Sequence, residues 1–193
     1  LPAFPTSRGS GATAYLTFDG GTLRPTASSS AYLGGLTSAT IRSGGITFDT
    51  NSYDITVSQA LLANATSTGG GLTKNGTGTL TLSGNNTYTG TTSVRAGSLV
   101  VAPGGVIAAG GLIDVLGGAF EVATGGSVGS PIVLAGTATS LNAGTVADVT
   151  VPAGTRFDNT GTQVGTGTVS GGTVNSSGAL GTVNVTAGSV TTT

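Results

Sequence analysis

The chain has 193 residues and a net charge of −1, and only 7% of its residues are charged. This balance supplies no cationic surface for phosphate groups, so it argues against nucleic acid and anionic membranes as partners. Glycine accounts for 36 residues and hydrophobic residues for 37%, while Cys, Met, Trp and His are absent. Such a chain is too apolar for disorder, and its many Thr and Val residues favour strands. The composition therefore predicts an all-β protein without disulfides.

The chain begins with LPAFPTSRGSG, which contains two prolines and several turn-forming residues. We interpret residues 1–13 as an N-terminal arm or linker and residues 14–193 as a single domain. The sequence starts without Met and without a charged and apolar leader. We therefore expect a processed product, an expressed segment or an excised fragment.

From Ala14 onward, short segments of alternating apolar and polar residues are separated by Gly, Asn or Pro. Successive side chains of a strand point to opposite sides, so Leu80 and Leu82 are expected to share an inward face opposite Thr81. The same pattern predicts three further strands, with inward Ile113 and Val115 around Asp114, Phe120 and Val122 around Glu121, and Val149 and Val151 around Thr150.

Apolar centres recur at roughly 20-residue intervals, which is a period typical of solenoids. They are Leu82, Val101, Val122 and Leu141. Each interval then forms one turn, and stacked turns share a core that no single turn could bury alone. Gly-Gly pairs fit the corners, and asparagines beside them are expected to bond the turn backbone or to stack as amide ladders. These asparagines are Asn75, Asn85, Asn86, Asn142 and Asn159.

Residues 100–120 have the length of a membrane span but contain Pro103, Asp114 and glycine pairs. We interpret them as strands with glycine corners, and expect no membrane insertion by this segment. From Gly161 onward the units become shorter, of the Gly-Thr-Val type, which predicts narrower turns. Because no polar cap ends the pattern, we expect the protein or an assembly of it to continue.

Residues 70–101 read GGLTKNGTGTLTLSGNNTYTGTTSVRAGSLVV. This segment closely resembles the autotransporter-associated β-strand repeat. The preceding segments FDGGTL at 18–23 and YLGGLTSATIRSGGITFDTN at 32–51 look like the sequence that leads into such repeats. The resemblance implies a right-handed parallel β-helix, export across the envelope of a Gram-negative bacterium, and a scaffold role at the cell surface.

Two patterns suggest catalytic or metal chemistry. Ser127 lies in Gly-Gly-Ser-Val-Gly, which matches the G-x-S-x-G nucleophile elbow, but the chain has no histidine to act as the usual base. We interpret this match as chance. Three Phe-Asp pairs place Asp19, Asp49 and Asp158 after an aromatic residue. We interpret each pair as an inward Phe and an outward Asp rather than as part of a calcium or glycosidase site.

Polysaccharide lyases also use right-handed β-helices, but they need clustered acids and a basic residue, and here both kinds are dispersed. Lys74 lies inside the repeat and is expected, like Glu121, in a solvated position. Tyr88 is expected at an exposed corner, where an aromatic ring can contact a sugar. We predict no catalytic residue, metal or cofactor, and the sequence identifies no ligand-binding residues.

The sequence thus predicts a non-catalytic, extracellular structural or adhesive β-helix segment of a bacterial surface protein. Two alternatives stay open: a subunit of a self-assembling extracellular fibre, and a carbohydrate-binding or carbohydrate-active β-helix. The sequence leaves open three kinds of partner: another copy of the chain bound end to end, a glycan, and a host surface.

Overall fold

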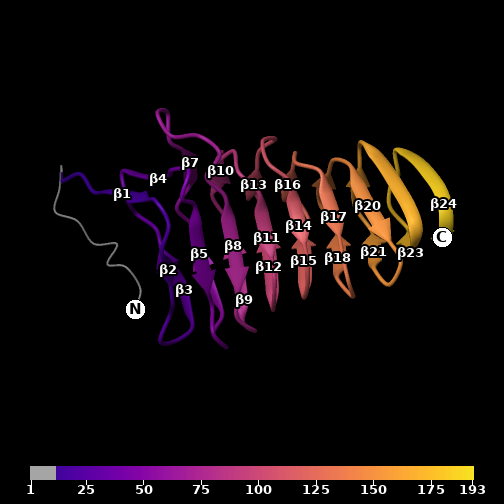
Figure 1. Cartoon of the computed structure of the whole chain (residues 1–193), viewed down its shortest axis with the longest axis horizontal. Helices are drawn as coiled ribbons and strands as arrows, with labels where there is room; N and C mark the ends of the chain where they lie inside the picture. The colour runs from indigo at the N-terminus through magenta and orange to yellow at the C-terminus, as the bar shows by residue number, and fades with distance from the viewer. Residues whose placement is uncertain (1–11) are drawn as a thin grey trace.

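The computed structural model describes residues 12–193, which form a parallel β-solenoid of about nine turns (Figure 1). Strands are the only regular elements of the described residues, and every pair of named strands is parallel. The predicted all-β solenoid is therefore confirmed, whereas its right-handedness stays a prediction. Most of the predicted arm, residues 1–11, lies outside the described residues.

Each turn contributes one short strand to each of three faces, because glycine-rich corners bend the chain after every few residues. We name the faces by their first strands. The β2 face contains β2 (Thr22–Leu23), β5 (Ile46–Asp49), β8 (Leu72–Asn75), β11 (Thr92–Val94), β14 (Ile113–Val115), β17 (Ile132–Leu134) and β20 (Val149–Pro152).

The other two faces follow the same stacking order. The β3 face contains β3 (Ser29–Leu33), β6 (Ile55–Val57), β9 (Thr79–Leu82), β12 (Ser98–Val101), β15 (Ala119–Val122), β18 (Thr139–Asn142) and β21 (Arg156–Asn159). The β1 face contains β1 (Tyr15–Phe18), β4 (Ser38–Ile41), β7 (Leu61–Ala63), β10 (Asn85–Asn86), β13 (Val106–Ile107), β16 (Ser127–Val128), β19 (Thr145–Val146) and β22 (Thr162–Gln163).

The core runs along the inside of the solenoid as columns of inward side chains. Leu82 pairs in register with Val101, which pairs with Val122, and all three are fully buried. Every strand for which the sequence predicted a facing buries the expected residues. Alternation therefore identifies the inward residues, and neighbouring turns bury them together.

Leu141 was predicted as a core residue, and this prediction is wrong. Leu141 pairs with Glu121 and is 40% exposed, whereas Asn142 pairs with Val122 and is fully buried. An average period of about 20 residues can place a core position one residue away from its true place. An error of one residue moves the side chain to the opposite face of the strand.

The turns become shorter toward the C-terminus. Hydrogen-bonded residues on neighbouring turns are 25 positions apart at Leu61 and Asn86, but 17 apart at Asn142 and Asn159. Paired residues are 16 positions apart at Thr166 and Thr182, so the turns after Gly161 are narrow as predicted, but the narrowing begins before Gly161. Two long strands, β23 (Thr166–Ser176) and β24 (Thr182–Thr192), form the last turns, and β23 pairs with both β20 and β21.

The stretch that has the length of a membrane span, residues 100–120, contributes to four strands, from β12 to β15. Among the residues that the structure describes, there is no helix with the length and apolarity needed to cross a membrane.

Candidate functional site

Ser127, the sequence candidate for a nucleophile, lies in the short strand β16. Its register neighbours on adjacent turns are Val106 and Thr145. A nucleophile elbow needs a sharp strand-to-helix turn, and here the serine lies within a parallel sheet. Within the described part of the chain, the structure therefore places neither the required turn nor a base at Ser127.

The three Phe-Asp pairs adopt the predicted facing. Phe18, Phe48 and Phe157 are buried, and the aspartates that follow them lie outside the core. Each aspartate forms an ion pair with an arginine: Asp19 with Arg42, Asp49 with Arg24, and Asp158 with Arg156, at N–O distances of 3.7, 3.4 and 2.8 Å. Within residues 12–193, no group of three or more potential metal ligands comes together.

Lys74 lies in the core, so the prediction of a solvated position is wrong. It is fully buried in β8, and its register neighbours on the β2 face are the buried Phe48 and Val94. Lys74 therefore takes a position that neighbouring turns fill with a hydrophobic side chain. The alternation itself contained this signal, because Leu72 and Lys74 share one face of the strand.

The Lys74 ammonium group bonds three backbone carbonyl oxygens at the corner that follows β8. Its Nζ donates to Asn75 at 3.0 Å, to Gly76 at 2.8 Å and to Ala96 of the next turn at 3.0 Å. These bonds match the three donors of an ammonium group. Burial is the largest influence on its pKa, which falls from 10.5 to about 8, while Asp49 and Asp54 oppose the shift.

A threonine of the preceding turn also bonds the corner around Lys74. The buried Thr50 Oγ1 lies 3.1 and 3.2 Å from the carbonyl oxygens of Asn75 and Gly78, and its single O–H is shared between them. Gly76 has a φ of +78°, a backbone conformation that glycine adopts without strain. The corner thus concentrates carbonyl oxygens, and Lys74 supplies the donors that they need inside the protein.

Tyr88 was predicted at an exposed corner, and this prediction is also wrong. Its side chain is only 2% exposed, and its hydroxyl group lies 2.6 Å from Thr92 Oγ1. Burial raises the pKa of Tyr88 to about 12, and the hydrogen bond with Thr92 partly opposes this shift. A buried ring cannot contact a sugar, so Tyr88 belongs to the packing of the solenoid.

The predicted amide ladder exists at two of the asparagines. Asn142 Nδ2 donates to Asn159 Oδ1 at 2.7 Å, and Asn159 Nδ2 donates to Ser176 Oγ at 3.0 Å. Asn86 is also buried, but it bonds backbone groups of Leu61, Gly84 and Val106 instead. These side chains satisfy interior polar groups and are not available to a ligand.

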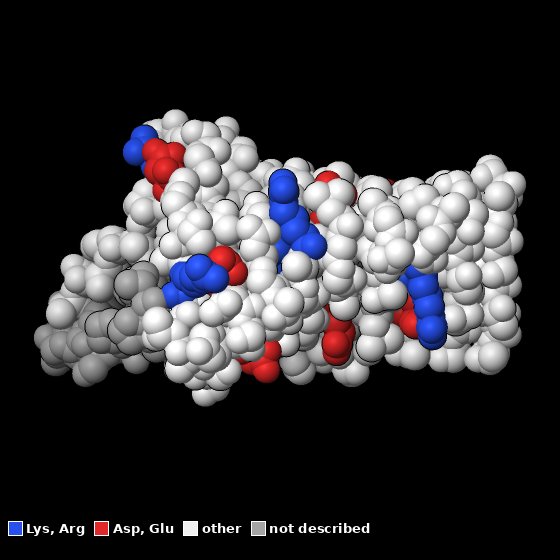
Figure 2. Space-filling model, turned by 60° about the horizontal axis from the view of Figure 1, so that its bottom comes forward, with Lys and Arg blue, Asp and Glu red and all other residues white. Residues whose placement is uncertain are grey.

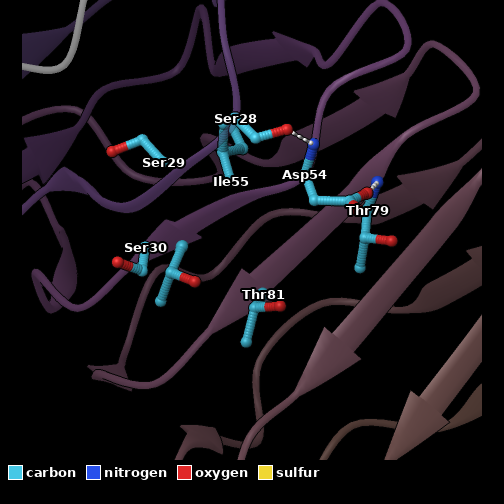
Figure 3. A pocket seen from close by; sticks show the side chains of 8 residues that line it. Ser28, Ser29, Ser30, Asp54, Ile55, Thr79 and Thr81 are labelled. Carbon is cyan, nitrogen blue, oxygen red and sulfur yellow. Dashed lines mark hydrogen bonds between the residues drawn. The ribbon is translucent and has the colours of Figure 1, made fainter.

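A hollow of about 470 Å³ opens on the β3 face at the N-terminal end of the solenoid (Figure 3). Its lining is dominated by hydroxyl groups, with one carboxylate and one apolar side chain: Ser28, Ser29, Ser30, Asp54, Ile55, Thr56, Thr79 and Thr81. Sequence reasoning did not find this site, because serines and threonines occur throughout the chain.

Asp54 is the charged group of this hollow, and hydrogen bonds fix it in place (Figure 3). Its Oδ1 accepts from the backbone N–H of Thr79 at 2.7 Å, and its own N–H donates to Ser28 Oγ at 3.1 Å. The backbone hydrogen bond from Thr79 is the largest influence that lowers the pKa of Asp54. The carboxylate is therefore charged, and it faces solvent beside the hydroxyl groups.

Most of the molecular surface is uncharged. Figure 2 shows a few basic and acidic groups scattered over one side of the solenoid, with several of opposite sign next to each other. The three arginine–aspartate pairs account for part of this pattern. Such exposed pairs contribute little to stability, but they leave few unbalanced charges at the surface.

Comparison with known proteins identifies one segment of the chain. Residues 72–101 match the family model of the passenger-associated-transport-repeat. This match confirms the resemblance at residues 70–101, and it includes Lys74, Leu82 and Tyr88. No curated protein and no solved structure matched the chain. The chain is therefore a β-solenoid that carries a passenger-associated transport repeat, the mark of autotransporter passengers that Gram-negative bacteria secrete or display on their surface.

Proposed function

We propose that this chain is a rigid, non-catalytic rod segment that holds other parts of a bacterial surface protein away from the cell. The observation that carries the proposal is the continuous core, which passes through about nine turns. Neighbouring turns bury their inward side chains together and pair their backbones along the axis. Such a stack resists bending because neighbouring turns pair without a break on the β2 and β3 faces, and on the β1 face within two sheets, β1-β4-β7 and β10-β13-β16-β19-β22.

The distribution of chemical groups supports a structural rather than a catalytic role. The register neighbours of Ser127 are Val106 and Thr145, and neither is a base. Three of the aspartates form ion pairs with arginines. Lys74, a candidate base, is fully buried and bonded to carbonyl oxygens. Catalysis by any of these groups would require a general acid or base that can form a hydrogen bond with the nucleophile or the substrate.

The change in turn length favours a rod segment over the fibre subunit that the sequence left open. Neighbouring turns are offset by 25 residues near Leu61 but by 17 near Asn159. Turns of such different circumference match poorly, so stacking this segment on a copy of itself would leave backbone groups of the wider turn unpaired. End-to-end association stays a prediction, and light scattering of the purified chain at high concentration measures it.

If the number of turns sets the length of the rod, removing one whole turn should shorten it by a fixed amount. Deleting residues 113–131 removes β14, β15 and β16 and lets Ile132 take the register of Ile113. We expect the variant to fold and to be shorter by about 5 Å, the spacing of paired strands. The chain has no cysteine, so spin labels on Cys variants of the exposed Ser52 and Thr186 measure the distance between turns.

The matched control deletes residues 113–127, which is less than a turn and shifts the register of all later strands. We expect this variant to lose cooperative unfolding, because a shifted register turns core residues outward. The proposal is wrong if the whole-turn deletion leaves the distance between the labels unchanged, or if it disrupts folding as much as the partial deletion does.

A further inference from the structure

We propose that the hollow on the β3 face binds a neutral glycan, with Asp54 and Tyr53 as its main contacts. This inference goes beyond the rod function, which needs no ligand. It rests on a local break in the regular solenoid, on the groups that line the break, and on a second hollow beside it.

The hollow coincides with an irregularity in β3. Ser29 pairs with Ile55 and Leu33 pairs with Val57, so the segment between the paired residues is longer in β3 than in β6. The extra residues interrupt the alternation, because Tyr32 and Leu33 are both buried although they are adjacent. Bulges of this kind redirect side chains and occur often beside functional sites. Here the bulge places serines at the rim of the hollow.

The lining of the hollow suits a ligand that is rich in hydroxyl groups. Serine and threonine hydroxyls both donate and accept, as sugar hydroxyls do, and Thr56 and Thr81 pair in register on neighbouring turns. Asp54 adds a carboxylate that accepts strong hydrogen bonds from hydroxyl donors. Because Thr79 fixes this carboxylate, a ligand need not order it on binding.

A second hollow, of about 340 Å³, supplies an aromatic side chain. It is lined by Arg24, Pro25, Thr26, Asn51 and Tyr53. The loop of residues 50–54 contributes to both hollows, since Tyr53 lines one and Asp54 the other. Tyrosine offers an apolar ring and a polar hydroxyl group, a combination that is common at recognition surfaces. Tyr53 thus takes the role that the sequence suggested for Tyr88.

The charges around the two hollows favour a neutral glycan over an acidic one. Among residues 12–193, no Lys or Arg lines the larger hollow, whose charged group is the carboxylate of Asp54. Arg24, in the smaller hollow, forms an ion pair with Asp49 and donates to Asn51 Oδ1 at 3.4 Å. A uronate would therefore meet a like charge at Asp54 and an arginine that is already paired.

The test is a titration of the isotope-labelled chain, followed by nuclear magnetic resonance. The probes are maltohexaose, cellohexaose and mannohexaose as neutral glycans and hexagalacturonate as the acidic one. We expect at least one neutral glycan to shift the amide signals of Ser29, Thr56 and Thr81, and hexagalacturonate to bind more weakly. Asp54→Ala and Tyr53→Ala should each weaken binding about tenfold, which is the loss of one good contact.

Two matched variants control for charge and for aromatic area. Asp114→Ala removes an acid from the β2 face, and Tyr15→Ala removes a tyrosine that is 70% exposed on the β1 face. Both should bind as the parent does, and thermal unfolding checks that all four variants are folded. If Tyr53→Ala unfolds, Tyr53→Leu replaces it.

The inference is overturned if no neutral glycan shifts these signals at millimolar concentration. It is equally overturned if hexagalacturonate binds as tightly as the neutral glycans, or if Asp114→Ala weakens binding as much as Asp54→Ala does. Each of these results leaves the rod proposal intact, because the turn deletion does not touch the hollow.

Discussion

The transport repeat and the last turns of the solenoid place polar groups in their interiors in different ways. In the repeat, the fully buried Lys74 extends its ammonium group from the core to the carbonyl oxygens of a corner. In the last turns, Asn142 and Asn159 form an amide ladder that ends at Ser176. The repeat has wider turns than the ladder, since paired residues are 20 positions apart at Leu72 and Thr92 but 17 apart at Asn142 and Asn159.

Both arrangements bridge neighbouring turns. Lys74 reaches Ala96 of the next turn, and Asn159 reaches the carbonyl oxygen of Ala179 at 3.0 Å. Hydrophobic contacts tolerate sliding, whereas these hydrogen bonds form only when the turns stack in one register. The comparison shows that the solenoid combines a non-directional core with directional bonds, which a lysine makes in the repeat and asparagines make in the last turns.

The largest expected effect comes from breaking the column of hydrophobic side chains that begins in the repeat and continues into the amide ladder of the last turns. Leu82→Asp places an unpaired charge between turns at a fully buried position, so we expect the chain to lose its cooperative unfolding transition. Circular dichroism during heating measures this loss. Glu121→Ala, which changes an outward side chain, should melt within a few degrees of the parent. Similar melting of the two variants would contradict the assigned facing.

Removing the ammonium group of Lys74 should have the next largest effect. Lys74→Met keeps most of the buried stem but removes three hydrogen bonds. The carbonyl oxygen of Asn75 keeps its bond from the Thr50 N–H, whereas those of Gly76 and Ala96 lose the Lys74 donor, which should lower the free energy of unfolding by about 2–4 kcal/mol. Urea denaturation measures the difference. If the methionine variant is as stable as the parent, water or a backbone shift must satisfy the corner without Lys74.

The amide ladder should contribute less to the free energy of unfolding than Lys74 does, because its hydrogen bonds join uncharged groups. Asn159→Ala removes the bonds from Asn142 and to Ser176, and should cost about 1–3 kcal/mol. The same urea experiment applies, with Asn175→Ala as a control that changes an asparagine outside the core. An equal cost for both variants would mean that the ladder adds nothing beyond ordinary surface bonds.

Lys74 also predicts that the stability of the chain depends on pH. Its pKa is lowered to about 8 in the folded chain, whereas the unfolded value is 10.5. Between these values the unfolded chain binds the proton more strongly, so the free energy of unfolding rises with pH, by at most about 1.4 kcal/mol per unit. Below about pH 8 this contribution is constant. The stability difference between the parent and Lys74→Met should therefore grow from pH 8 to pH 10, and a constant difference would argue against the shift.

Ser140 gives the smallest expected effect, and it has the opposite sign. Its hydroxyl group is buried between Phe120 and Phe157 and has no hydrogen-bond partner among residues 12–193. Ser140→Ala removes this unsatisfied group and should stabilise the chain by up to about 1 kcal/mol. Differential scanning calorimetry measures the change. A lower melting temperature would show that the hydroxyl group bonds water.

Much of the fold is encoded locally, which explains why the sequence predicted it. Alternation assigned the facing of Leu80, Phe120 and Val149 correctly, because a strand that is buried on one side has only one suitable register. The repeat motif identified residues 72–101 for the same reason, since its glycines and leucines recur at corners and in the core.

The errors arose where tertiary structure overrides residue type. Lys74 and Tyr88 were assigned to the surface because their polar groups prefer water, but the corner supplies carbonyl oxygens to one and a hydroxyl group to the other. The hollow beside Asp54 depends on a bulge in β3, and a bulge depends on how two strands pair across turns. Neither the bulge nor the hollow follows from the spacing of residues in a single strand, whereas the alternation in β8 already places Lys74 on the same face as the buried Leu72.

The shortening of the turns gives each turn a fixed place in the series. A turn can be lost or copied next to a neighbour of similar circumference, but it cannot be moved to the other end without leaving backbone groups unpaired. Growth of such a protein by duplication is therefore confined to adjacent turns. The decrease in turn length therefore restricts the order of the turns, because each turn stacks well only beside turns of similar length.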